Sequence, residues 1–108
     1  MAQGVDLWAA QICYERKIPF TAAVPFVGQE KVWPEQARKR WEFLLGRAAK
    51  VEIVCKGGYS PEKMQKRNEW MVDRCDVLLA VWDGTSGGTG NCVRYAQNQG
   101  KRIVRINP

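Results

Sequence analysis

The chain has 108 residues, of which 45% are hydrophobic and 26% are charged, and its formal net charge is +6. This composition is that of a globular domain with one core, and it excludes a low-complexity or disordered chain. The apolar runs are far shorter than the roughly 20 residues that a membrane span needs. Gly4 and Asp6 also stand where a signal peptide would place a basic flank and an apolar stretch. We therefore expect one cytoplasmic domain over residues 1–108, with no membrane contact.

The first four predicted elements alternate between helix and strand. They are a helix over residues 4–16, a strand over 20–26, a helix from Pro34 to Ala48 and a strand over 51–56. Val5, Trp8 and Ile12 recur at helical spacing, so this stripe of the first helix is expected in the core. Proline opens the second helix, whose own apolar stripe includes Trp41 and Leu44.

The second half of the chain continues the alternation. Ser60 followed by Pro61 is typical of a helix start, with serine as the N-cap and proline in the first turn. The last four predicted elements are a helix to about Cys75, a strand over 77–83, a helix from about Thr89 to Gln99 and a strand over 102–107. The run VLLAVWD is the most apolar of these and is predicted to be a central strand.

Four helices alternating with about four continuous apolar strands predict an α/β fold. The expected architecture is a doubly wound parallel sheet with helices on both faces. Ligands of such sheets bind beyond the carboxyl ends of the strands. Three loops follow strands in this way: VGQEKVW, KGGYS and DGTSGGTGN.

The loop DGTSGGTGN leads from a strand into a helix N-terminus. Such a corner gathers unpaired backbone N–H groups, and the helix dipole adds partial positive charge, which suits a phosphate or carboxylate. Glycine allows positive φ angles and lets an anion approach the backbone. The candidate ligand-binding residues here are Asp83, Gly87, Gly88, Thr89, Gly90 and Asn91. Alternatively the glycines serve only the turn, since the loop is neither a Walker loop nor a dinucleotide fingerprint.

Arg67 is a further candidate ligand-binding residue. It lies one helical turn from Met64 and Met71, at the edge of the apolar stripe, and an arginine there can clamp a phosphate with two hydrogen bonds. The alternative is a surface arginine paired with Glu69 or Asp73. Other polar residues in or beside the predicted ligand loops, for which capping a turn or packing at a rim is the favoured interpretation, are Glu30, Tyr59 and Asp83.

The four cysteines and the absence of histidine limit the chemistry of the chain. No two cysteines are spaced as in zinc or thioredoxin-like sites, so buried free thiols are the favoured interpretation. Without histidine, metal-assisted hydrolysis and a Ser-His or Cys-His nucleophile are not expected. We predict neither a metal nor a cofactor.

The basic charge favours an anionic partner. The basic residues are scattered along the sequence, which is typical of a solvated surface. A nucleic acid is one alternative, although no helix-turn-helix, zinc finger or RNA-recognition aromatic pair is present. A small phosphorylated ligand would explain the charge equally well.

Nearly the whole chain resembles the SLOG superfamily, and specifically its YpsA-like branch, which is frequent in bacteria and phages. The resemblance is carried by GVDLWAA, PFTAAVPFVGQE, KGGYSPEKM and the long run MQKRNEWMVDRCDVLLAVWDGTSGGTGNCVRYA. It implies a Rossmann-like domain that binds nucleotides or nucleotide-derived ligands.

The superfamily is related to the LOG phosphoribohydrolases, whose signature pairs Met-His-x-Arg-Lys with Pro-Gly-Gly-x-Gly-Thr-x-x-Glu. The first motif falls here on residues 64–68 and keeps Arg67, and the second falls on residues 87–94 and keeps its glycines. Arg94 replaces the acid that LOG enzymes use to cleave the N-glycosidic bond. Because a cation cannot stabilise an oxocarbenium ion or act as a base, the resemblance implies phosphate binding without LOG-type hydrolysis.

Relatives of this kind usually begin with a strand ending in Thr-Gly and a second strand before the GVD helix, and this sequence lacks both. Their absence predicts an uncovered sheet edge or helix face. A homodimer is the simplest way to cover it.

These observations together predict a protein that binds a nucleotide-like, phosphate-bearing ligand at residues 87–91 with help from Arg67. It would act as a sensor or sequestering protein rather than an enzyme. One alternative is a nucleoside-phosphate hydrolase that recruits Glu30, Asp83 or another carboxylate in place of the missing acid. The other is a nucleic-acid or protein-binding module that uses the basic surface.

Overall fold

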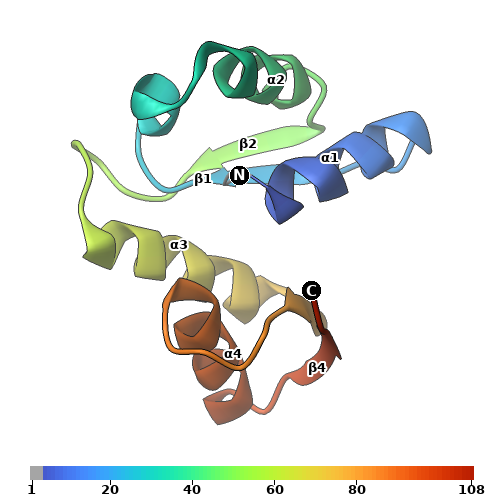
Figure 1. Ribbon diagram of the computed structural model, residues 1–108, viewed down its shortest axis with the longest axis vertical. Helices are drawn as coiled ribbons and strands as arrows, with labels where there is room; N and C mark the ends of the chain where they lie inside the picture. Colours follow the sequence, from blue (N-terminus) through green and yellow to red (C-terminus); the bar gives the residue numbers. More distant parts are fainter. Residues whose placement is uncertain (1–3) are drawn as a thin grey trace. The chain divides into compact units, whose positions relative to one another are not determined.

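The computed structural model describes residues 4–108, in which four α-helices alternate with four β-strands (Figure 1). The strands pair in parallel within two two-stranded sheets, β1–β2 and β3–β4. The predicted Rossmann-like α/β class is confirmed. The chain divides into two compact units, Met1–Tyr59 (unit 1) and Ser60–Pro108 (unit 2). None of the described helices has the length and apolar character needed to cross a membrane.

Unit 1 contains three helices and two strands. In chain order they are α1 (Val5–Glu15), β1 (Thr21–Val24), the short 3-10 helix η1 (Gln29–Val32), α2 (Glu35–Leu45) and β2 (Lys50–Ile53). In the parallel pair, Thr21 lies opposite Lys50 and Val24 opposite Ile53. Trp41 and Leu44 are buried in the core with Ala22 and Val24, which confirms the predicted inner stripe of the second helix.

The predicted core face of α1 is wrong. Val5, Trp8 and Ile12 are 42%, 59% and 51% exposed, whereas Leu7 and Ala10 are buried in the unit 1 core. Both faces of this helix are apolar, so helical spacing alone does not decide which one packs inward. Leu7 and Ala10 are three residues apart and therefore also share a face.

Unit 2 contains α3 (Pro61–Arg74), β3 (Val77–Val81), α4 (Gly88–Asn98) and β4 (Arg102–Ile106). The predicted start of α3 is confirmed, because the Ser60 side chain accepts a hydrogen bond from Lys63 N at 3.2 Å and proline occupies the first turn. Helix α4 contacts both strands and also packs against α3.

The two faces of the β3–β4 sheet differ in burial. Ala80 is buried, whereas Leu79 is 62% exposed and Val77, Val104 and Ile106 are also exposed. The continuous apolar sequence of β3 predicted burial on both faces. In unit 2, α4 covers one face and the other remains open among the described residues.

A hydrogen bond from Tyr95 joins α4 to α3, and it predicts a pH-dependent loss of stability. The Tyr95 hydroxyl donates to Asp73 Oδ1 at 2.7 Å. This bond, followed by burial and the negative charges of Asp73 and Glu69, raises the pKa of Tyr95 to about 12 from the ordinary 10.0. Only the neutral phenol can donate, so its stabilisation is complete below pH 10 and is lost as the pH rises through about 12.

We therefore expect one phenolate absorbance step near pH 12 in the folded protein, which Tyr95→Phe removes. Ultraviolet titration measures it, and circular dichroism at each pH shows whether the protein is still folded. The contradicting outcome is that Tyr95→Phe removes a step near the ordinary tyrosine pKa of 10.0 and none near 12. Tyr95 would then titrate as an ordinary tyrosine, and its hydrogen bond to Asp73 would not form in solution.

Candidate functional site

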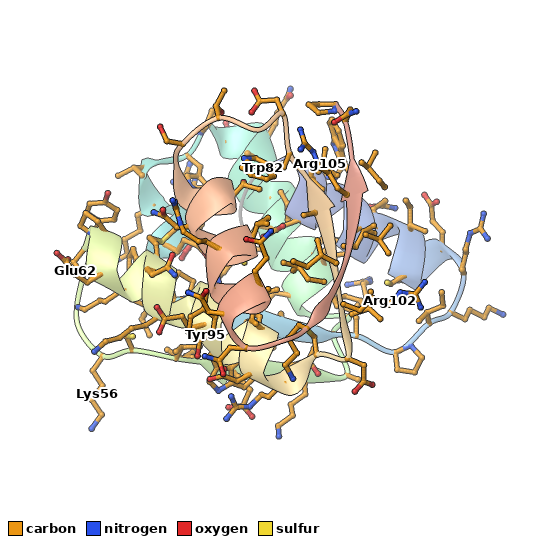
Figure 2. The ribbon with its side chains drawn as sticks, turned by 90° about the horizontal axis from the view of Figure 1, so that it is seen from below. Lys56, Glu62, Trp82, Tyr95, Arg102 and Arg105 are labelled. Atoms are coloured by element: carbon orange, nitrogen blue, oxygen red, sulfur yellow. The ribbon has the colours of Figure 1, made fainter. Side chains whose placement is uncertain are left out.

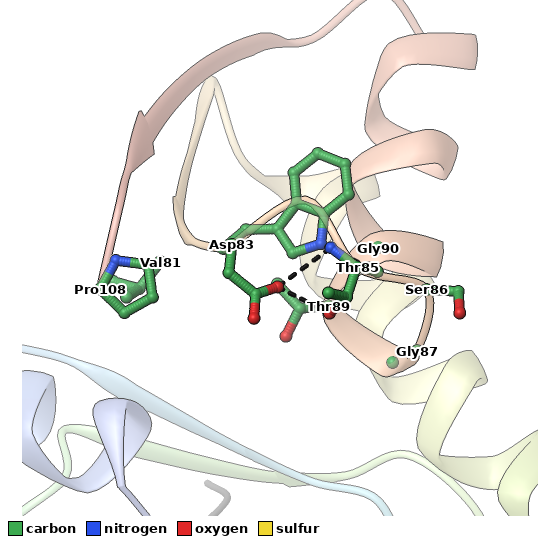
Figure 3. A pocket seen from close by; sticks show the side chains of 10 residues that line it. Val81, Asp83, Thr85, Ser86, Gly87, Thr89, Gly90 and Pro108 are labelled. Carbon is green, nitrogen blue, oxygen red and sulfur yellow. Dashed lines mark hydrogen bonds between the residues drawn. The ribbon is translucent and has the colours of Figure 1, made fainter.

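The loop after β3 and the first turn of α4 enclose a pocket of about 250 Å³ (Figure 3). Five of the seven candidate ligand-binding residues line it: Asp83, Gly87, Gly88, Thr89 and Gly90. The structure therefore brings together most of the residues selected from the sequence. They come from one continuous corner of unit 2, where the carboxyl end of a strand meets a helix N-terminus.

Asp83 fixes the conformation of the loop after β3 through hydrogen bonds. Its Oδ1 accepts hydrogen bonds from Thr85 N at 3.0 Å and Thr85 Oγ1 at 2.6 Å, drawn as dashed lines in Figure 3. These two bonds hold the pKa of Asp83 below its usual value, and Arg105 contributes a smaller electrostatic effect in the same direction. The carboxylate is therefore ionised at neutral pH and engaged in the turn, so it is poorly suited to act as a general acid.

Trp82 and Arg105 also stabilise the loop, and neither was predicted from the sequence as a site residue. Trp82 Nε1 donates to Thr85 O at 2.8 Å. The Arg105 guanidinium lies 4.8 Å from the centre of the Trp82 ring, and its Nε donates to Trp82 O at 3.2 Å (Figure 2). The register places Arg105 opposite Ala80, near the end of β3. This contact can be predicted from the sequence only if the register between β3 and β4 is already known.

The glycines of the loop have different physical roles. A Cβ on Gly90 would lie 2.9 Å from Thr85 O and 3.5 Å from the Trp82 side chain, so this glycine allows the loop to pack on the helix. Gly87 has a φ of 147°, which disfavours other residues. A Cβ on Gly87 or Gly88 would meet no atom within 4 Å. Space above these two glycines is therefore open to a ligand.

The first turn of α4 carries backbone N–H groups next to this space, since Gly88, Thr89 and Gly90 line the pocket. The helix begins at Gly88, and Asn91 N donates to Gly87 O at 2.9 Å. The N–H groups of Gly88, Thr89 and Gly90 come before this first intrahelical hydrogen bond. No carbonyl group of the helix can therefore accept a hydrogen bond from them. No side chain caps this N-terminus within the described part of the chain.

Asn91 and Arg67, the other two candidates, do not line the pocket. Asn91 Oδ1 accepts a hydrogen bond from Arg94 Nη2 at 2.9 Å, along the surface of α4. Arg67 is only 4% exposed, and its Nε donates to Asn68 Oδ1 at 3.1 Å. The interpretation of Arg67 as an exposed surface residue is therefore wrong, and its contact with a ligand stays a prediction.

The titratable side chains do not form a recognisable metal site. Across residues 4–108, no three His, Cys, Asp or Glu side chains are grouped so that they could hold a metal ion. The four cysteines are half-buried and form no disulfide among the described residues.

Comparison with known proteins gives a family match over almost the entire chain. Residues 1–106 match the model of the YspA SLOG family. A UPF0398 protein of Bacillus cereus (strain B4264) is 35% identical over 92 residues, which cover 80% of this chain and 50% of that protein. The SPbeta prophage-derived protein YoqJ of Bacillus subtilis (strain 168) is 37% identical over 99 residues, which cover 80% of this chain and 58% of that protein. The chain spans about half the length of the curated relatives it matches.

Proposed function

Because this chain belongs to the YspA SLOG family, as its motifs predicted, we propose that unit 2 binds the phosphate of a nucleotide-like ligand at the N-terminus of α4. The ligand would accept hydrogen bonds from the amides of Gly88, Thr89 and Gly90. The side chains of Ser86 and Thr89, which also line the pocket, supply hydroxyl groups beside it.

The observation that carries this proposal is the open, uncapped first turn of α4. Three successive amides lack an intrahelical acceptor, and two glycines leave space in front of them. The first turn of α4 also contains no acidic residue, whereas those of α1, α2 and α3 contain Asp6, Glu35 and Glu62. An acid there would compete with a bound anion for the amides and the helix dipole.

The same corner supports binding without hydrolysis. Arg94 stands where the LOG motif has its acid, and its guanidinium is held by Asn91. Asp83, the carboxylate that lines the pocket, is engaged by Thr85. Neither side chain is therefore available as the base or stabilising carboxylate that N-glycosidic cleavage needs. A sensor or sequestering role fits this arrangement best.

Gly88→Ala tests the proposal. We expect the affinity for ribose 5-phosphate and for nucleoside monophosphates to fall at least about tenfold, because a methyl group would stand between the phosphate and the amides. The folded protein should be as stable as the wild type or slightly more so, since this Cβ meets no atom within 4 Å and alanine favours a helix. Titration calorimetry and thermal unfolding measure the two effects.

Gly46→Ala is the matched control, because its Cβ would make only ordinary contacts at 3.6 Å in unit 1. It should bind phosphate like the wild type. The proposal is wrong if Gly88→Ala leaves phosphate affinity unchanged, or if wild-type protein binds no phosphate compound. Release of free base from a nucleoside monophosphate by the wild type would favour the hydrolase.

A further inference from the structure

Unit 1 contains a buried polar side chain that has no hydrogen-bond partner. Gln29, the first residue of η1, is only 5% exposed, yet neither Oε1 nor Nε2 has a partner among the described residues. The neighbouring Glu30 has a buried, unpaired Oε2 as well.

These groups lie just beyond the carboxyl end of β1, in a parallel sheet. The segment after β2 runs along the same edge, since Val54 N donates to Val24 O at 2.8 Å and Cys55 N donates to Pro25 O at 3.0 Å. This is the edge at which ligands of parallel α/β sheets bind. The unpaired atoms of Gln29 therefore lie at a position typical of binding sites.

Two aromatic residues of unit 1 come from the segments that follow the carboxyl ends of β1 and β2. Phe26 is buried three residues before Gln29, and the Tyr59 ring packs edge-on against it with centroids 6.1 Å apart. Tyr59 is 72% exposed, so much of its ring remains free to contact a planar molecule. Aromatic side chains of this kind stack on nucleobases.

A buried amide without partners destabilises the free protein, because it loses its hydrogen bonds to water and gains none in return. An apolar side chain of similar shape would avoid this cost. Such a group in a folded protein calls for an explanation, and an external hydrogen-bonding partner supplies one. The partner must present both a donor and an acceptor to satisfy both atoms of the amide.

We propose that Gln29 and Glu30 form a binding site for a purine base within unit 1. This rests on the proposed function only in taking the ligand to be nucleotide-like. A glutamine amide forms two hydrogen bonds with the edge of a purine, donating to a ring nitrogen or carbonyl and accepting from an amino or ring N–H group. Glu30 Oε2 provides a further acceptor for the purine, and the exposed Tyr59 ring stacks on it.

Access to the amide requires only a local opening of η1. This four-residue turn is held by Lys31 N to Gly28 O at 3.1 Å and Trp33 N to Glu30 O at 3.0 Å. Side chains at both ends of this segment face solvent, since Val27, two residues before η1, is 69% exposed and Val32, its last residue, is 91% exposed. Short surface segments of this kind open at low free-energy cost compared with global unfolding.

Replacing the Gln29 amide by an apolar group of similar shape tests the proposal in the intact chain. Gln29→Met and Gln29→Leu should raise the midpoint of thermal unfolding, by about 4 °C or more, because the unpaired amide is gone. The same variants should weaken the binding of adenosine or guanosine at least about tenfold. Gln36→Met is the control for the substitution, since Gln36 is exposed on α2, and it should change neither property.

The two measurements separate this proposal from the phosphate site. Adenosine and guanosine carry no phosphate, and ribose 5-phosphate carries no base, so Gln29→Met should leave binding of ribose 5-phosphate unchanged. The proposal is overturned if neither nucleoside binds the wild type, or if the Gln29 variants bind nucleosides like the wild type. A lower unfolding midpoint in both variants also overturns it, since the amide would then have a structural partner.

Discussion

Gly90→Ala is expected to destabilise unit 2 by about 1–3 kcal/mol and to abolish phosphate binding, because it forces an extra methyl group into a packed corner. The new Cβ would lie 2.9 Å from Thr85 O, closer than such atoms approach in folded proteins. Thr85 O is also the acceptor of the Trp82 indole at 2.8 Å. Moving Thr85 away from the methyl group therefore breaks this bond and disturbs the loop that forms the pocket.

The comparison with Gly88→Ala makes this prediction specific. Both substitutions add one methyl group to the first turn of α4, but only the Cβ at position 90 meets other atoms. Urea unfolding followed by circular dichroism should show a loss of stability in Gly90→Ala alone, whereas both variants should lose phosphate affinity. Equal stability of the two variants would contradict the close packing of the loop on the helix.

The sequence predicts local features of this fold well where the signal is itself local. Alternating apolar runs predict the order of helices and strands, and Ser60 with Pro61 predicts the start of α3. The pocket residues from Asp83 to Gly90 are contiguous in the sequence, and a strand followed by glycines and a helix allows little other geometry. Most of the candidate site could therefore be predicted without any long-range contact.

Features that depend on packing could not be predicted in this way. The inner face of α1 is set by contacts of Leu7 and Ala10 with the rest of the core, because both sides of the helix are apolar. Arg105 reaches Trp82 only because the register sets β4 beside β3. The burial of Gln29 depends on the conformation of the loop after β1, and hydrophobic periodicity carries no information on that conformation.

The open face of the β3–β4 sheet leads to a second prediction with a large effect. Leu79 lies opposite Val104, and Val81 opposite Ile106, so these side chains form one apolar strip. Leu79, Val104 and Ile106 are 62%, 39% and 45% exposed. A contiguous apolar surface of this kind marks an interaction site more often than it is left in water. We propose that two copies of the chain pack on each other through this strip.

Leu79→Glu should then convert the dimer into a monomer. In a two-fold symmetric interface each substitution acts twice, and each copy loses the burial of a leucine side chain and would have to bury a carboxylate without a partner. The dissociation constant of the dimer should rise on the order of 100-fold or more. Native mass spectrometry or sedimentation equilibrium over a range of protein concentrations measures this dissociation constant.

Val32→Glu is the control, because it changes a 91% exposed apolar residue outside the strip, and it should leave the dimer intact. A monomeric wild type, or a dimer that persists in Leu79→Glu, would show that this face is not the interface.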